Sequence, residues 1–324
     1  MCTAIGLTNG DFYFGRNLDL ECSFGENIVI TPRNYRFSFK TGEVLEEHEA
    51  IIGMATVIDD YPLYAEGCNE SGLCISSLNF PQNAFYHDKK EGKLNIGSFE
   101  LIPYILTKYE NVKDLKEDIE GFNIIDEPFK KEIGTAPLHW IVSDREGSLV
   151  IESVEDGLKV YDNPIGVLTN NPPFHFYEEY IKHFMKVNPH NPKNEFSDNL
   201  SIKPYGQGFG MIGIPGDTSP ASRFIKAAFL KENSVSGEGE ESNVTQFFHI
   251  LENVSMVRGS TITDEGKYDI TTYSCCINAD KGIYYYKTYD NYRINAISMK
   301  KENLEEDKLI RFKLNDTADF LYGN

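Results

Sequence analysis

The chain has 324 residues, of which 40% are hydrophobic, so it can bury a substantial core and is not a disordered polypeptide. Its formal net charge of -19 argues against a nucleic-acid partner, because it would repel a phosphate backbone. The first fifteen residues resemble no secretory leader, and no stretch reaches the roughly 18 apolar residues of a membrane span. We therefore expect a cytoplasmic protein with no membrane partner.

A β-hairpin is predicted at the start of the chain. Two apolar runs, Cys2 to Leu7 and Phe12 to Arg16, flank the turn Thr8-Asn9-Gly10-Asp11. Asn-Gly between two apolar runs is the strongest short-range signal for a hairpin. Cys2 is therefore expected to begin an ordered strand.

The middle of the chain contains two helical patterns followed by three strand patterns. Residues 98–109 place apolar side chains on one face, with Pro103 expected to kink or shorten the helix, and Asn111 is suited to cap a second helix. Strand-like runs follow at 138–143, 148–154 and 158–161, separated by short turns. This spacing predicts an antiparallel meander.

The last third of the chain repeats the mixture of helices and strands. Ser219 as N-cap and Pro220 at the first helical position predict a helix to residue 231, and a second helix is predicted from 243 or 244 to about 256. Strand patterns follow at 270–278, 282–288 and 293–299. Short antiparallel connections indicate an α+β fold, and because no linker divides the chain we expect a single domain over residues 1–324.

The cysteines give no metal or disulfide pattern. There are six of them, at Cys2, Cys22, Cys68, Cys74, Cys275 and Cys276. They form no C-x-x-C pair and no Cys/His spacing suited to zinc, so we expect no metal and no other cofactor. Five are expected to be small buried hydrophobes, as free cysteines usually are in a reducing compartment. Cys2 is the exception, because a terminal position normally frays and offers no packing reason for a cysteine.

Cys2 can supply two parts of an amidase. Once Met1 is removed, a thiol and a free α-amine belong to the same residue, and such amines have a reference pKa of about 7.7 to 8.0. The amine can then act as the base that takes the proton of the attacking thiol. Arg16 and Asp19 stand at the end of the partner strand, where a cation can favour a thiolate and a carboxylate can orient the amine.

A series of short motifs, in matching order from residue 1 to about 310, resembles the choloylglycine hydrolase family. The motifs are Met-Cys-Thr-Ala at the start, Phe14-Gly15-Arg16-Asn17-Leu18-Asp19, Ile30-Thr31-Pro32-Arg33-Asn34-Tyr35, Asp60-Tyr61-Pro62, Leu78-Asn79-Phe80-Pro81, Leu138-His139-Trp140, Gly166-Val167-Leu168-Thr169-Asn170-Asn171-Pro172, Pro215-Gly216-Asp217, Ser222-Arg223-Phe224 and Gly282-Ile283-Tyr284-Tyr285-Tyr286. The resemblance implies an N-terminal-nucleophile hydrolase fold, a four-layer αββα sandwich of two antiparallel sheets, with Met1 removed on maturation.

The resemblance also implies the catalytic residues, carried over by position. Cys2 is the nucleophile, and five residues support it: Arg16 and Asp19 beside it, Asn79 and Asn170 on the oxyanion side, and Arg223 as a charge near the thiol. Asn171 is the alternative to Asn170, which we prefer because it directly follows Thr169 as in the family motif. Without the resemblance, Asn79 and Asn170 would be interpreted as turn residues.

An apolar pocket is implied by the same match. Its members are Leu18, Phe24, Ile58, Ala65, Phe129, Ile133 and Leu138. Asparagine at position 79, where many penicillin V acylases have tyrosine, favours hydrolysis of glycine- or taurine-conjugated bile salts through a thioester acyl-enzyme. The alternatives are a penicillin V acylase and a non-catalytic small-molecule binding protein of the same fold. Residues 66–76, which include Cys68 and Cys74, depart from the usual family pattern, and this bears on substrate preference.

Two further expectations concern the histidines and the assembly. A Cys/His enzyme is a competing interpretation, but the seven histidines are scattered; His139 and His249 lie in apolar runs and are expected in the core. The resemblance implies a homotetramer, for which the segment 188–210 is a candidate assembly loop, and a small amphipathic amide as substrate. Because any amine that enters the site can attack a thioester, acyl transfer to free amino acids is also expected.

Overall fold

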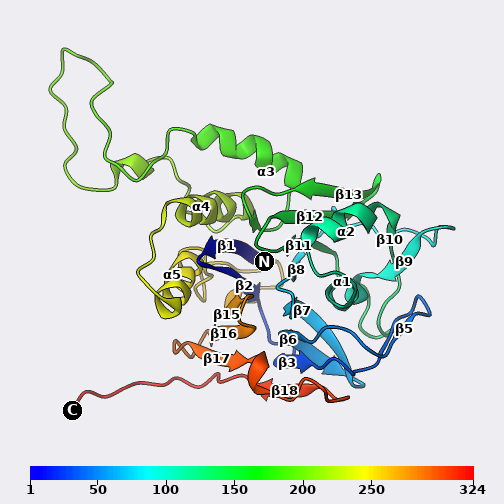
Figure 1. Cartoon of the computed structure of the whole chain (residues 1–324). Coiled ribbons are helices and arrows are strands. Elements are labelled where there is room, and N and C mark those ends of the chain that lie inside the picture. The colour runs from blue at the N-terminus through cyan, green and yellow to red at the C-terminus, as the bar shows by residue number, and fades with distance from the viewer.

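The computed structural model describes residues 1–324 and contains two large β-sheets stacked face to face, with helices outside each (Figure 1). The six-stranded sheet has the order β14-β1-β2-β15-β16-β17, and the eight-stranded sheet has the order β13-β12-β11-β8-β7-β6-β3-β18. Neighbouring strands in both sheets are antiparallel.

The six-stranded sheet consists of β1 (Cys2–Asn9), β2 (Asp11–Leu20), β14 (Val167–Leu168), β15 (Ile270–Asn278), β16 (Ile283–Thr288) and β17 (Asn295–Ser298). The eight-stranded sheet consists of β3 (Asn27–Thr31), β6 (Ile51–Ile58), β7 (Tyr61–Asn69), β8 (Cys74–Asn79), β11 (Leu138–Ser143), β12 (Ser148–Val154), β13 (Gly157–Asp162) and β18 (Ile310–Lys313). Two short pairs join β4 (Phe37–Ser38) to β5 (Val44–Leu45) and β9 (Leu94–Gly97) to β10 (Phe122–Ile125).

The helices are α1 (Leu101–Lys108), α2 (Val112–Asp118), α3 (Phe174–Tyr180), α4 (Pro220–Asn233) and α5 (Glu240–Glu252). Five 3-10 turns lie at Ser98–Glu100, Ile119–Gly121, Ile181–Phe184, Phe209–Met211 and Met299–Lys301. Both α4 and α5 pack on the six-stranded sheet, whereas α1 packs on the eight-stranded sheet (Figure 1). The layers therefore follow the order αββα, and the predicted α+β class is confirmed.

Two apolar clusters explain why the layers adhere. The larger one has 38 buried residues and fills the space between the sheets and beneath α4 and α5. The second has 23 buried residues and lies between the eight-stranded sheet and the pair α1 and α2. Burial of apolar surface on both faces of each sheet provides the main stabilisation of such a sandwich. None of the helices combines the length and hydrophobicity that crossing a membrane requires.

The predicted N-terminal hairpin is present. β1 and β2 pair from Asn9 opposite Asp11 back to Cys2 opposite Leu18. Gly10 turns the chain with a φ of +70°, a conformation that glycine adopts without strain. The hairpin lies in the middle of the six-stranded sheet, so Cys2 starts a central strand and not a frayed end.

Most other predicted elements are also confirmed, including the meander β11-β12-β13 and the Asn111 cap, whose side chain accepts from the backbone N–H of Asp114. Pro103 does not kink α1, because it lies in the first turn, where its missing N–H has no partner to lose. The helix predicted from residue 243 begins earlier, at Glu240. Cys22, expected to be buried, is exposed, and so is His249.

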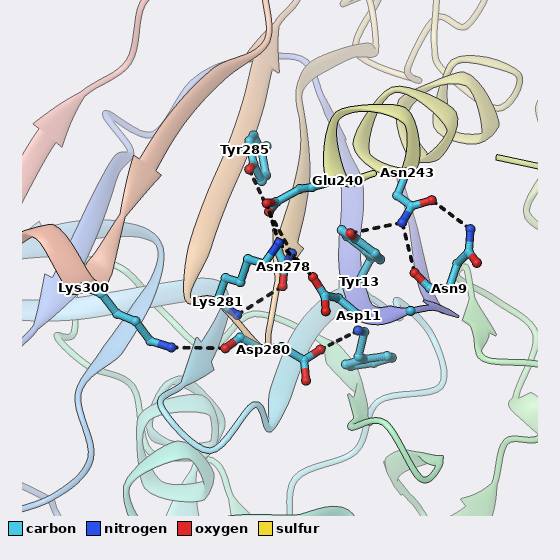
Figure 2. Close-up of polar contacts among 12 residues, drawn as sticks. Asn9, Asp11, Tyr13, Glu240, Asn243, Asn278, Asp280, Lys281, Tyr285 and Lys300 are labelled. Atoms are coloured by element: carbon cyan, nitrogen blue, oxygen red, sulfur yellow. Dashed lines mark hydrogen bonds and ion pairs between the residues drawn. The ribbon is translucent and has the colours of Figure 1, made fainter. Parts of the chain in front are cut away.

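A polar network anchors the start of α5 to the six-stranded sheet (Figure 2). Glu240 accepts hydrogen bonds from Asn278 Nδ2 at 2.8 Å and Tyr285 OH at 2.9 Å, and pairs with Lys281 Nζ at 2.7 Å. Asn243, on the same helix, donates to a backbone carbonyl of β1 at 3.0 Å. The network fixes the helix over the hairpin that carries Cys2.

Candidate active site

Cys2 is buried at the start of β1, with 2% of its surface exposed. Its backbone nitrogen donates a hydrogen bond to Asn170 Oδ1 at 2.9 Å. Met1 precedes it, and the Met1 ammonium lies 3.5 Å from Asp269 Oδ2 and donates to the backbone carbonyl of Asp19. The position of the Cys2 nitrogen is therefore defined with Met1 attached.

Asn170 follows β14, and its side-chain amide is held at both ends. Its Oδ1 accepts from Cys2 N and from Arg223 Nη2, the latter at 2.7 Å, while its Nδ2 donates to the Asn79 carbonyl at 2.7 Å. Because both atoms of the amide are occupied, its orientation is set by the network. Asn171 is directed elsewhere, since its Nδ2 donates to the carbonyl of Pro81 at 2.5 Å.

Arg223 connects α4 to the start of β1. It lies in the first turn of α4, after Pro220, and is 1% exposed. Its Nη1 donates to Thr3 Oγ1 at 2.6 Å and to the Cys2 carbonyl. Burial lowers the pKa of the Arg223 guanidinium, and the nearby Asp19 carboxylate opposes this effect. Because an arginine side chain is not deprotonated in proteins, Arg223 remains a cation despite this effect.

Asp19 is a buried carboxylate with one free oxygen. It is 0% exposed; its Oδ1 accepts from Thr271 Oγ1 at 2.6 Å, and its Oδ2 has no hydrogen-bond partner. Burial raises the pKa of the Asp19 carboxyl, and Arg223 and the chain's terminal ammonium act in the opposite direction. A buried acceptor without a partner is costly, so Oδ2 is suited to receive an ammonium hydrogen.

Arg16 lies beside Cys2 on the inner face of the six-stranded sheet. Register pairs Ala4 with Arg16 and Cys2 with Leu18, and alternation along β1 puts Cys2 and Ala4 on one face, so the Cys2 and Arg16 side chains share it. Burial lowers the pKa of Arg16, but the interactions with Cys2, Tyr273 and Glu66 outweigh burial and leave that pKa raised. The Arg16 cation therefore lies close to the Cys2 sulfur.

The Arg16 side chain crosses to the opposite sheet. Its Nη1 donates to Ser76 Oγ at 3.0 Å, to the Ala65 carbonyl at 3.3 Å and to the Ser77 carbonyl, and it lies 3.6 Å from Glu66 Oε2. Its Nη2 is buried and has no hydrogen-bond partner. The eight-stranded sheet therefore holds Arg16 Nη1, while the N–H groups of Nη2 remain free to donate hydrogen bonds.

Asn79 ends β8 directly opposite Leu138, the first residue of β11. Its carbonyl is bound by Asn170 Nδ2, and the residue is half-buried. The Asn79 backbone carbonyl is thus connected to the Cys2 nitrogen through the side-chain amide of Asn170, which bonds to both. This connection makes the Asn79 side-chain amide a candidate donor to a substrate oxygen.

A mainly apolar cavity of about 180 Å³ adjoins this end of the sheet. Three of the seven predicted pocket residues line it, namely Phe129, Ile133 and Leu138. Leu63, Tyr64, Ser77, Phe99, Ile102 and Trp140 also contribute to its wall. A larger polar cavity of about 730 Å³, near the β1–β2 turn, contains none of the predicted site residues.

The other four predicted pocket residues lie outside the cavity. Leu18 is opposite Cys2, and the carbonyl of Ala65 is bound by Arg16, so both are adjacent to predicted catalytic residues. Phe24 is 61% exposed in the loop after β2, and Ile58 ends β6 half-buried. The two residues border open surface in this structure.

Several contributors to the site were not identified from the sequence. Thr271 binds Asp19, Asp269 faces the N-terminus, and Glu66 faces Arg16. The sequence does contain a signal for Glu66: it lies within the mainly apolar run of a central strand, where a charged side chain requires a buried partner. His139, predicted to be a core residue, is fully buried, and its two ring nitrogens lie 3.1 Å from Glu152 Oε1 and 3.0 Å from the Thr169 carbonyl oxygen.

Comparison with known proteins agrees with this geometry. The model of the linear amide C-N hydrolases, choloylglycine hydrolase family, matches residues 2–317. A bile salt hydrolase/transferase from Lactiplantibacillus plantarum is 44% identical over 324 residues, covering 100% of both chains. The solved structure of the C2A mutant of the conjugated bile acid hydrolase from Clostridium perfringens has a TM-score of 0.92 at 40% identity, covering 100% of each chain.

The fold is shared more widely. Penicillin V acylase from Agrobacterium tumefaciens is 18% identical, has a TM-score of 0.77, and is matched over 98% of this chain and 92% of its own. At that identity the likeness concerns the fold alone. The match of the family model, together with full-length relatives above 40% identity, settles the classification. The chain belongs to the choloylglycine hydrolase family of linear amide C–N hydrolases.

Proposed function

We propose that the protein hydrolyses the amide bond of glycine- or taurine-conjugated bile salts, with Cys2 as nucleophile once Met1 has been removed. The observation that carries the proposal is the buried hydrogen bond from the Cys2 nitrogen to Asn170 Oδ1. It fixes the group that becomes the α-amine, beside a thiol that shares its sheet face with the Arg16 cation. The names of the full-length relatives supply the substrate class.

Each protein group has a defined task in the first half of the reaction. The neutral α-amine of Cys2 takes the thiol proton, and the sulfur attacks the amide carbon, so that an oxyanion forms. We assign the binding of this oxyanion to the Asn79 amide, because Asn170 has committed its own Nδ2 to a backbone carbonyl. Asn170 therefore acts on the amine more directly than on the oxyanion.

The intermediate then collapses and releases the amine. The carbon–nitrogen bond breaks, the α-ammonium returns its proton to glycine or taurine, and the bile acid remains on sulfur as a thioester. In the second half the α-amine takes a proton from water, the hydroxide attacks the thioester, and the thiol and free bile acid are restored. Asp19 Oδ2, which has no partner, is the acceptor available to the α-ammonium during both halves.

The bile acid body is expected to occupy more than the enclosed cavity. The cavity has a volume of about 180 Å³, which is smaller than the roughly 300 Å³ at which pockets for drug-sized ligands begin. We place one end of the steroid against Phe129, Ile133 and Leu138, and the remainder over the open surface near Leu18 and Phe24. The cavity by itself would suit a smaller acyl group, so substrate comparison is required.

Replacing each of two cysteines tests the proposal. Cys2→Ala should abolish release of cholate from glycocholate, whereas Cys22→Ala, which removes an exposed thiol, should leave the rate unchanged. Intact mass should show that active material lacks Met1. A wholly Met1-bearing population with full activity would contradict the proposed base, because the Cys2 nitrogen would then be an amide.

Acyl transfer is a second proposed activity, supported by the hydrolase/transferase names of two full-length relatives. An amine that enters in place of water would attack the same thioester and form a new amide. Incubation of glycocholate with excess of a second amino acid should yield its cholate conjugate. Free cholate as the sole product across a range of pH would contradict this activity.

We also propose a homotetramer. The segment 188–210 projects from the body of the molecule (Figure 1) and exposes apolar side chains at Phe196 (83%), Leu200 (49%), Ile202 (50%) and Tyr205 (96%). Exposed apolar groups of this size usually meet another protein surface. Light scattering should give a mass near four times 36.8 kDa, and a monomer at micromolar concentration would contradict the assembly.

Two remaining proposals concern organisation and location. The chain is proposed to fold as a single domain, because β1, β8 and the C-terminal strand β18 all belong to sheets that enclose one shared cluster. A cytoplasmic location is proposed because all six cysteines are free, which suits a reducing compartment.

A further inference from the structure

Glu66 is a fully buried carboxylate between the two sheets. It belongs to β7 of the eight-stranded sheet, yet its partners come from the six-stranded sheet. Tyr284 OH donates to Oε1 at 2.5 Å, Tyr273 OH donates to Oε2 at 2.8 Å, and the Cys275 thiol lies 3.6 Å from Oε1. Arg16 Nη1 lies 3.6 Å from Oε2 and completes the set.

Local irregularities in both sheets accompany this arrangement. The pairing of β6 with β7 shifts between Met54 and Ala55, which leaves Ala65 as an extra residue immediately before Glu66. The pairing of β2 with β15 shifts between Thr271 and Tyr273, immediately before the first tyrosine partner. Bulges of this kind re-aim neighbouring side chains and are frequent beside functional sites.

The partners of Glu66 favour its ionised form. The two tyrosines, the thiol and the guanidinium are all donors, and an ionised carboxylate accepts hydrogen bonds without donating any. Burial has the largest effect and leaves the pKa of Glu66 raised, while Arg16, the two tyrosines and the thiol act to lower it. A buried cation and a buried anion in contact each reduce the cost of the other.

We propose that Glu66 is a positioning residue for the nucleophile. It holds Arg16 so that the unpartnered Nη2 is available to the Cys2 sulfur. The negative charge of Glu66 also limits how strongly the Arg16 cation favours the Cys2 thiolate. This inference rests on the proposed role of Cys2 as nucleophile. Glu66 forms no hydrogen bond or ion pair with Cys2, so it acts through Arg16.

Few charged and titratable groups surround Glu66 and the Cys2 sulfur. Glu66 faces Arg16 from β2, Tyr273 and Cys275 from β15, and Tyr284 from β16. The Cys2 sulfur interacts with Arg16 from β2 and with Arg223 from α4, and Asp19 interacts with Arg223. Removing the Glu66 charge therefore leaves Arg16 as a less compensated buried cation on the Cys2 side.

The experiment measures thiol reactivity directly, without a substrate. Mature wild-type protein and Glu66→Gln would be alkylated with iodoacetamide between pH 5 and pH 9, and modification of the N-terminal peptide would be followed by mass spectrometry. We expect the reactivity profile of Glu66→Gln to move to lower pH by about one unit, because a nearby uncompensated cation favours the thiolate. The acid limb of kcat/KM should move in the same direction.

Glu100→Gln is the matched control. Glu100 is also a buried glutamate, 1% exposed, but it accepts from backbone N–H groups of Lys40 and Gly97 on the other face of the eight-stranded sheet. Both variants should lose thermal stability, whereas the alkylation profile should move in Glu66→Gln alone. Equal profiles in wild type and Glu66→Gln, or the same shift in Glu100→Gln, would overturn the inference.

A second variant keeps the test decisive if Glu66→Gln does not fold. Tyr284→Phe removes one donor to the carboxylate and should give a smaller shift in the same direction; an unchanged profile would overturn the inference. Because alkylation needs no bile salt, its outcome is separate from the proposed substrate. Failure to hydrolyse any conjugate would contradict the function, while an unshifted thiol profile would contradict the role of Glu66.

Discussion

Cys2 and Asn170, 168 residues apart in the chain, are joined by a buried hydrogen bond of 2.9 Å from the Cys2 backbone nitrogen to the asparagine side-chain oxygen. The bond forms because β1 lies between β2 and β14 in the six-stranded sheet, which brings the residues after β14 to Cys2 at the start of β1. Asn170 therefore fixes the nitrogen that we propose as the base, and Arg223 and Asn79 fix Asn170.

Substitution of adjacent asparagines tests this relationship. Asn170→Ala should lower kcat by about a hundredfold, the loss expected when a proton-transfer group is no longer positioned. Asn171→Ala should cost less than about fivefold, because its amide binds Pro81 and not Cys2. Steady-state kinetics with glycocholate measure both. A larger loss in Asn171→Ala would shift the assignment by one residue.

Arg223 should not be replaceable by lysine. Its guanidinium reaches Thr3, Cys2 and Asn170 simultaneously, a fork geometry that an ammonium group cannot reproduce. We expect Arg223→Lys to lower kcat/KM at least about tenfold while circular dichroism shows a folded protein. Wild-type kinetics in a folded Arg223→Lys would mean that one positive charge is sufficient.

The apolar cavity should determine substrate affinity. Phe129 lines it and packs against Phe99 and Tyr61, with ring centroids 5.4 Å away in both cases. Phe129→Ala should raise KM for glycocholate by about tenfold and change kcat less, because binding area is lost at about 25 cal/mol per Å². Phe320→Ala is the control, since Phe320 is 74% exposed near the C-terminus. An unchanged KM in Phe129→Ala would place the acyl group elsewhere.

The network at the start of α5 should stabilise the protein above the acidic range. Burial tends to raise the pKa of Glu240, but hydrogen bonds from Lys281, Tyr285 and Asn278 outweigh it and leave that pKa lowered (Figure 2). A depressed carboxyl pKa gives stability that is complete above the unfolded value of about 4.3 and is lost as pH falls through the folded value.

Thermal unfolding of wild type and Glu240→Gln at two pH values measures this contribution. The difference in Tm between the two proteins should be largest near pH 6 and should shrink as pH falls through the lowered folded pKa of Glu240, because the protonated glutamate is then neutral like glutamine. Taking the difference cancels the effects of other carboxyls, including buried Asp19 and Glu66, whose raised pKa values act in the opposite direction. A difference that grows on acidification would contradict the sign.

Elements with local signals could be predicted from the sequence. The β1–β2 hairpin has its Asn-Gly turn, and α2 has its Asn111 cap, so neighbouring residues determine both. The prediction that His249 lies in the core is wrong, because an apolar run in a helix has an exposed side as well as a buried one. In α5, Phe248 and Ile250 face the sheet while the helical period turns His249 outward.

The candidate catalytic site depends on tertiary structure to a greater degree. Residues 2, 16, 79, 170 and 223 come from four strands or their ends and one helix, so no local pattern could join them, and the ordered family motifs were the guide. The role of Glu66 could not be predicted from local sequence, because its partners Tyr273 and Tyr284 lie in the opposite sheet, more than 200 residues away in sequence. Its position becomes apparent when the two sheets are stacked.

The most direct test of the central claim is the ratio of kcat/KM for glycocholate to that for penicillin V, measured on mature protein from which Met1 has been removed. Burying a steroid body removes far more apolar surface than burying a phenoxy group, and an advantage of about 2.8 kcal/mol in the transition state corresponds to roughly a hundredfold preference. We predict a ratio of about one hundred or more, and its loss in Cys2→Ala. Equal values, or a preference for penicillin V, would contradict the assignment of bile salts as substrate.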